Sequence, residues 1–129
     1  MQVPEANVRR VGDLEVYRKL VELHLRVNEV SLEFPKFELY ELGSQLRRAS
    51  NSAPANLAEG FNNRHVGNYL EAINRAMGEL RESQHHLMIA HRKGYLDRRS
   101  YKLFMDEYGQ AAKMLRGLER SLVKSNGSG

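Results

Sequence analysis

The chain has 129 residues, enough for one domain with a substantial core and too few for two comfortable ones. Lys and Arg total 20 against 16 Asp and Glu, a net charge of +4. The sequence contains no cysteine, which excludes disulfides, thiol nucleophiles and thiolate metal sites and suits a reducing compartment.

The charge is unevenly distributed. Residues 1–60 hold 8 basic and 9 acidic side chains (net −1), whereas residues 61–129 hold 12 and 7 (net +5). No apolar run approaches the about 20 residues that a membrane helix needs. We therefore expect a cytoplasmic protein without membrane contact, with one domain over residues 1–124 and a flexible tail over 125–129.

The first predicted helix begins after Asp13, a plausible N-cap, and ends at Pro35. Its core positions recur at steps of four and three, the spacing of a helix packed in a bundle: Val16, Leu20, Leu23, Val27, Val30 and Phe34. A second apolar set lies off this seam: Leu14, Val21, Leu25 and Leu32. Because this set remains after the core is filled, we expect it to form an oligomer interface.

The second predicted helix covers residues 38–59 and contains Pro54. Apolar positions keep helical spacing on both sides of the proline: Leu39, Leu42, Leu46, Ala49, Ala53 and Leu57. Proline costs roughly 3 kcal/mol inside a helix, so we expect a bend at Pro54 rather than a stop. Gly60 is expected to follow this helix in the left-handed conformation.

The third predicted helix covers residues 66–93 and ends at Gly94, a left-handed cap. Its seam consists of Tyr69, Ile73, Ala76, Leu80, Ser83, Leu87 and Ala90. Asp97 is expected to cap the fourth helix, whose seam consists of Tyr101, Phe104, Tyr108, Ala111, Leu115, Leu118 and Leu122.

Short connections between four such helices predict an all-α fold, an antiparallel up-down-up-down four-helix bundle. The small residues on the second and third helices should let their backbones approach closely.

Catalysis and metal binding are not expected. Glu82 and His85 form one Glu-x-x-His pair, but a di-iron bundle needs a second copy and further inward glutamates, which the sequence lacks. No nucleophile and base converge in a recognisable pattern either. We therefore expect a non-enzymatic protein without metal or cofactor.

Several basic residues lie near helix ends or loops, where they could contact phosphates: Arg47, Arg48, Arg64, Arg92, Lys93, Arg98 and Arg99. For any one pair a solvated surface is the alternative interpretation. In a closed ring each cluster would be repeated, giving an electrostatic footprint that a monomer at +4 lacks. Without an aromatic stacking platform, no sequence specificity is predicted.

Two segments resemble the signature of a known family. Gln-Leu-Arg-Arg-Ala at 45–49 and Ser-Ala-Pro-Ala-Asn-Leu-Ala-Glu-Gly at 52–60 are similar to the 23S rRNA intervening-sequence proteins, which are bacterial four-helix bundles. The resemblance implies a homopentamer and no established activity, and Arg47 and Arg48 match the family run. His65 departs from it, because a Ser or Thr cap would be usual before the third helix.

A bundle of similar form, the accessory variability determinant of diversity-generating retroelements, binds nucleic acid and a reverse transcriptase. We therefore expect a homo-oligomer that binds RNA or DNA through its basic clusters. The alternative is a protein-interaction scaffold that docks a partner such as a nucleic-acid enzyme, with its arginines in ion pairs between subunits.

Overall fold

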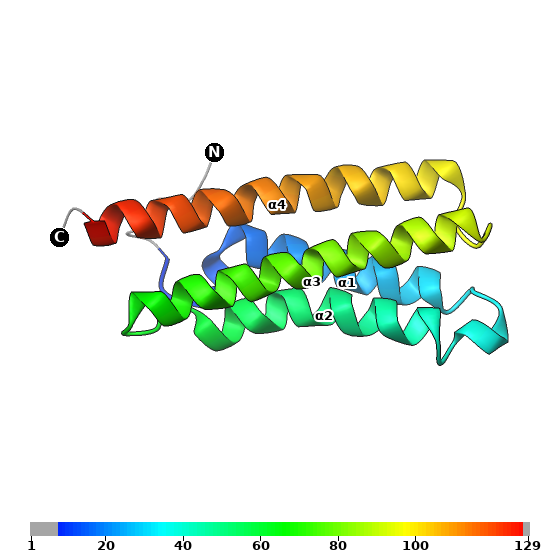
Figure 1. The fold of residues 1–129 in the computed structure, drawn as a ribbon, viewed down its shortest axis with the longest axis horizontal. Coiled ribbons are helices and arrows are strands. Elements are labelled where there is room, and N and C mark those ends of the chain that lie inside the picture. The colour runs from blue at the N-terminus through cyan, green and yellow to red at the C-terminus, as the bar shows by residue number, and fades with distance from the viewer. Residues whose placement is uncertain (1–7, 128–129) are drawn as a thin grey trace.

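Four long helices run back and forth along one axis (Figure 1). The computed structural model describes residues 8–127, and within them it contains no strand. The α-helices are α1 (Glu15–Ser31), α2 (Leu42–Gly60), α3 (Val66–Arg92) and α4 (Arg98–Gly127). Two 3-10 helices precede α1 and α2: η2 (Val11–Asp13) and η3 (Lys36–Glu38). The predicted all-α four-helix bundle is confirmed.

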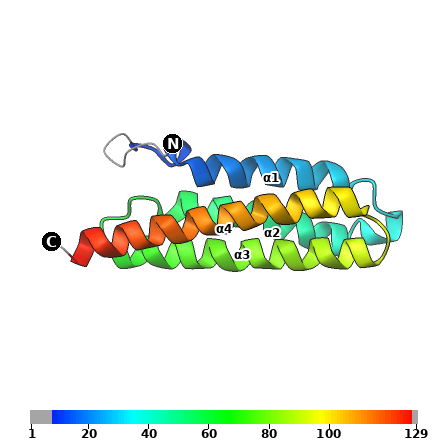
Figure 2. The ribbon, with the colours of Figure 1, turned by 90° about the horizontal axis from the view of Figure 1, so that it is seen from above.

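Each helix packs against the next in the chain, and α4 closes the arrangement against α1. Figures 1 and 2 together place α4 over α1 and α3, on the side of the bundle opposite α2. Neighbouring helices are antiparallel, as the short connections predict. All four helices contribute to one apolar core.

The predicted seams face this core. Every predicted seam residue of α3 is buried, as are four of the seven in α4, while Tyr101, Leu118 and Leu122 are partly buried against the core. The interface between α2 and α3 is the most extensive in the bundle, and Ala49, Ala53 and Ala76 are buried without any exposed surface. Small side chains at such positions allow helices to approach closely.

The N-terminus of α1 differs from the expectation. Asp13 closes η2 instead of capping α1: its carboxylate accepts the backbone N–H groups of Arg9 at 2.9 Å and Arg10 at 3.0 Å. These two bonds lower the pKa of Asp13. Leu14, in an extended conformation, then takes the N-cap position without a side-chain bond.

Helix α2 continues through Pro54, as predicted. Its C-terminus differs, because Gly60 is the last helical residue and the positive φ (51°) falls on Asn62. Glycine serves close packing here: a Cβ on Gly60 would lie 2.2 Å from the Cβ of Ala72. The first turn also differs, since residues 36–38 form η3 rather than the start of α2.

The connection from α3 to α4 follows the prediction. Gly94 has φ of +82°, and the N–H of Tyr95 donates to the carbonyl of Ala90 at 2.9 Å, which completes a left-handed cap. Asp97 caps α4 by accepting the N–H of Ser100 at 2.7 Å, a bond that lowers its pKa. His65 precedes α3 without a side-chain cap, and Asn63 accepts its N–H at 3.0 Å.

The C-terminal end is more helical than expected. Residues 125–127, predicted to be a flexible tail, belong to α4, and residues 128–129 lie outside the described residues. Adding residues to a formed helix costs little, so α4 continues where no proline interrupts it.

Candidate nucleic-acid interface

The seven predicted phosphate ligands occupy three separate parts of the bundle. Arg47 and Arg48 lie on α2, and Arg64 lies in the turn between α2 and α3. Arg92, Lys93, Arg98 and Arg99 surround the turn between α3 and α4. This turn and Arg64 are at opposite ends of α3, whose 27 residues span about 40 Å. A single monomer therefore does not bring all seven together.

The Arg47 guanidinium already makes hydrogen bonds within the chain. Its guanidinium donates to the Ser31 hydroxyl at 3.0 Å and to the Leu39 carbonyl at 2.7 Å. Both partners belong to the end of α1 and its connection to α2. Arg47 therefore fixes this connection, and a phosphate would have to replace bonds already made.

Arg48 is also paired within the chain. Its guanidinium contacts the carboxylate of Glu82 and lies 3.6 Å from that of Glu79, both on α3. His86 lies 3.3 Å from the same Glu82 carboxylate. Arg48 thus links α2 to α3 and shares its charge with two acids.

Lys93 joins the two connections at one end of the bundle. Its ammonium donates to the Glu38 carboxylate at 2.8 Å, and the Tyr95 hydroxyl donates to the same oxygen at 2.9 Å. The Lys93 bond is the main cause that lowers the pKa of Glu38, whose side chain is only 5 % exposed. The same bond raises the pKa of Lys93. A buried carboxylate therefore already neutralises this predicted phosphate ligand.

The remaining predicted ligands are exposed: Arg64, Arg92, Arg98 and Arg99. Among the residues that the structure describes, none of the four makes a hydrogen bond or ion pair through its side chain. Arg99 acts electrostatically on the carboxylate of Asp97, whose pKa it helps to lower. Arg92, Arg98 and Arg99 form the only predicted group in the described chain that is both clustered and free of ion pairs.

A further basic surface lies outside the predicted basic clusters, on helix α4. Helix α4 holds seven Lys and Arg against three Asp and Glu, a net charge of +4, so the other residues of the chain sum to zero. Its exposed cations past the middle of the helix recur at steps of three, four and four: Lys113, Arg116, Arg120 and Lys124. We call these four residues the α4 stripe.

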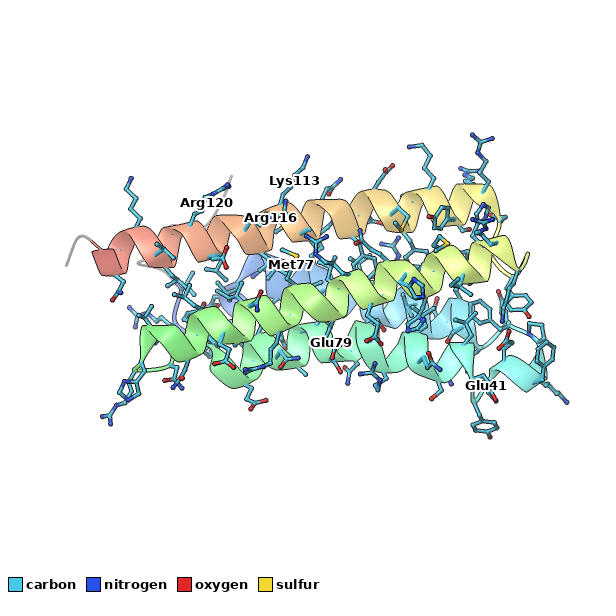
Figure 3. The ribbon with its side chains drawn as sticks, in the orientation of Figure 1. Glu41, Met77, Glu79, Lys113, Arg116 and Arg120 are labelled. Carbon is cyan, nitrogen blue, oxygen red and sulfur yellow. The ribbon has the colours of Figure 1, made fainter. Side chains whose placement is uncertain are left out.

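The α4 stripe extends over about 16 Å of the helix axis. Lys113 and Arg120 extend from α4 away from the other helices (Figure 3). Within the described part of the chain, no carboxylate forms an ion pair with any of the four. The same spacing rule that identified the apolar seams would have found this stripe in the sequence, had it been applied to cations as well.

A shallow groove lies beside the α4 stripe, between α3 and α4. Its volume is about 240 Å³. The lining residues are Ile73, Asn74, Met77, Arg81, Leu115, Arg116 and Glu119. Ile73 and Leu115 are buried and lie beneath its floor, and Figure 3 places Met77 between the two helices.

The predicted oligomer interface is only partly exposed. Leu14 is buried in the core of its own chain, so it offers little surface to a partner. Val21 is half-buried, whereas Leu25 and Leu32 are 52 % and 59 % exposed. Leu103 of α4, which the sequence analysis did not include, is 53 % exposed.

Charged side chains fix α4 against α1. Glu107 of α4 accepts a hydrogen bond from Arg26 at 2.5 Å, and Lys19 lies 3.5 Å from the same carboxylate. The Arg26 bond is the main cause that lowers the pKa of Glu107. Because this acid faces α1, it does not offset the outward charge of the α4 stripe.

Residues 8–127 contain no group of three or more His, Cys, Asp or Glu arranged to hold a metal ion. Within the same residues, no helix is long and apolar enough to cross a membrane.

Comparison with known proteins shows a match to a protein family and a similarity to a solved structure. The sequence pattern of the 23S rRNA-intervening sequence protein family matches residues 12–117. Among solved structures, the chain is similar to a protein of unknown function from the S23 ribosomal protein family of Bacteroides thetaiotaomicron VPI-5482, with 22 % identity, a TM-score of 0.70, and coverage of 81 % of this chain and 97 % of that one. At this identity the likeness supports the fold alone. No curated protein matches the chain.

Proposed function

We propose that this chain, which belongs to the 23S rRNA-intervening sequence protein family, is a non-enzymatic protein that binds structured RNA along the outer face of α4. The observation that carries the proposal is the α4 stripe, a row of four exposed cations without intramolecular ion pairs among the described residues. Its spacing gives one cation for about every 5 Å of helix axis. Such a row follows a nucleic-acid backbone by charge and requires no base contact.

The charge distribution favours α4 over the arginines of the family signature. Arg47 and Arg48 are engaged by groups of the same chain, and a phosphate would have to compete with two carboxylates for Arg48. The α4 stripe meets no such competition from the described residues. Arg98 and Arg99 begin the same helix and would extend the contact toward the α3–α4 turn.

Charge removal tests this proposal. In a variant carrying Lys113→Gln, Arg116→Gln and Arg120→Gln, we expect the affinity for a fluorescent RNA hairpin at 50 mM salt to fall by about two orders of magnitude or more, because each phosphate contact contributes through counterion release. The control removes three exposed cations that form no ion pair among the described residues and are not predicted phosphate ligands: Arg9→Gln, Arg10→Gln and Lys36→Gln. If the two variants lose the same amount of RNA affinity, the effect comes from net charge alone, and a site on α4 is contradicted.

A second candidate function is a protein-interaction scaffold, favoured by the exposed apolar side chains Leu25 and Leu32 on α1 and Leu103 on α4. In this alternative the chain would dock a partner such as a nucleic-acid enzyme without contacting nucleic acid itself, and Leu25 and Leu32 would also serve the predicted contact between copies of the chain. Apolar contacts respond weakly to added salt, whereas phosphate contacts weaken steeply. If the protein assembly persists at high salt while RNA dissociates, the apolar side chains serve protein contacts and the α4 stripe serves RNA binding.

A further inference from the structure

We propose that the groove between α3 and α4 holds an unpaired guanine of the RNA that lies along α4. This inference rests on the proposed function, because the groove and the α4 stripe share Arg116. A phosphate held by the stripe would therefore bring an adjacent base to the mouth of the groove.

The groove has a composition suited to a nucleobase. Ile73 and Leu115 lie beneath its floor and expose almost no surface, so the apolar contact comes from Met77, whose polarisable thioether is half-buried against the core. Its volume of about 240 Å³ lies just below the range of about 300–1,000 Å³ typical of small-molecule pockets. One base matches this size better than a dinucleotide or a larger cofactor would.

The charged groups of the groove are free to bind. Arg81 on α3 and Arg116 on α4 are exposed, and Glu119, also on α4, is half-buried. In the part of the chain that is described, none of these three side chains makes a hydrogen bond or an ion pair. The groove thus offers two cationic donors and one anionic acceptor to a ligand, beside the Asn74 amide, which both donates and accepts hydrogen bonds.

This combination selects guanine by its hydrogen-bonding pattern. A carboxylate only accepts hydrogen bonds, and guanine is the one base whose Watson–Crick edge presents two adjacent donors, N1–H and the N2 amino group. Adenine, cytosine and uracil offer no such pair of neighbouring donors on that edge. Guanine also presents O6 and N7 as acceptors, the pair of atoms that arginine contacts most often.

The base must be unpaired for this contact to form. In a duplex the Watson–Crick edge is already occupied, and sequence-specific recognition of RNA is concentrated in loops and bulges for this reason. The expected ligand is therefore a hairpin or a bulged helix in which phosphates contact the α4 stripe and one guanine leaves the stack.

Five hairpins with the same stem and the same guanine-free loop test the inference: one with a fully paired stem, and four with a single G, A, C or U bulged from the stem. Fluorescence anisotropy at constant salt gives the five affinities. We expect the bulged G hairpin to bind about tenfold more tightly than the other four. In the Glu119→Gln variant, the ratio between bulged G and the fully paired hairpin should approach one. Glu59→Gln on α2, an equal change of charge at an exposed site, should retain the ratio.

Two results would overturn the inference. One is equal affinity of the wild type for all five hairpins, and the other is a guanine preference that survives Glu119→Gln. If the fully paired hairpin binds as tightly as the bulged G hairpin and the α4 triple variant loses both, the groove assignment fails while the proposed function stands. If none of the hairpins binds, both fail.

Discussion

The ammonium of Lys93 lies 2.8 Å from the carboxylate of Glu38 and joins the α3–α4 turn to the connection between α1 and α2. The two residues are 55 positions apart in the chain. From the sequence, Lys93 belongs to a basic cluster near a turn, whereas in the fold it neutralises a buried acid. The position of a cation in the chain therefore does not tell whether its charge is available to a ligand.

Replacing Glu38 with Gln should destabilise the bundle. The pKa of Glu38 is lowered in the folded state, so its contribution is present above its unfolded pKa of about 4.3 and is lost as the pH falls through the folded value. We expect a lower urea midpoint at pH 7 and a weaker loss of stability below pH 5 than in the wild type. Glu41→Gln, at an exposed neighbour, is the control. Equal midpoints for Glu38→Gln and wild type would contradict this role.

Two glycine substitutions should have opposite effects. A Cβ on Gly60 would lie 2.2 Å from the Cβ of Ala72, so Gly60→Ala should destabilise the protein by about 1–3 kcal/mol. Gly78 lies within α3, and a Cβ at this position would meet no atom within 4 Å, so Gly78→Ala should stabilise by about 0.5–1 kcal/mol. Thermal or urea unfolding measures both. If Gly60→Ala leaves the free energy of unfolding unchanged, α2 and α3 can move apart easily at this point.

His24 should make stability depend on pH. Its Nδ1 lies 2.8 Å from the Ser50 hydroxyl, and burial lowers its pKa. As the pH drops, the His24 imidazole is protonated at a higher pH in the unfolded chain than in the folded chain. The free energy of unfolding should therefore fall as the pH drops from 7 to 5, through the unfolded pKa of about 6.5. His24→Gln should reduce this slope in urea titrations at several pH values. An unchanged slope would assign the pH dependence in this window to another group.

Self-association should depend on the exposed apolar residues of α1. Leu25→Glu with Leu32→Glu should lower the mass measured by light scattering, because charge at both positions opposes burial. The control places glutamate at two exposed positions of α2 with the same spacing, Asn51→Glu and Ala58→Glu. An assembly that remains intact in the Leu25 and Leu32 variant would reject this face as the interface.

The fold could be predicted because its main determinants are local and periodic. The seams of α3 and α4 recur every three or four residues, and Gly94 and Asp97 mark the turn between them through interactions within six positions. Of the helix ends that differ from the prediction, those at Asp13 and Gly60 have a common cause. At both positions a neighbouring segment determines the role of the residue. The Asp13 carboxylate accepts backbone N–H groups at the start of η2, and the close approach of α3 leaves no room for a side chain at Gly60.

The candidate site was harder to predict because the availability of a charge depends on long-range partners. Arg48 is 34 residues from Glu82, and no spacing rule connects them. The α4 stripe, in contrast, is visible as a helical pattern of cations in the sequence. Its significance emerges only once the structure shows that three of the other predicted cations, Arg47, Arg48 and Lys93, are bound within the fold.

The salt dependence of RNA binding tests the central claim most directly. The measurement is the slope of log K against log salt concentration for the fully paired hairpin, compared between the wild type and the variant carrying Lys113→Gln, Arg116→Gln and Arg120→Gln. Each phosphate contact contributes about −0.7 to −0.9 to this slope. If α4 binds the backbone, the wild type should show a steep negative slope and the variant a slope shallower by about two. Equal slopes in the two proteins would contradict phosphate binding on α4.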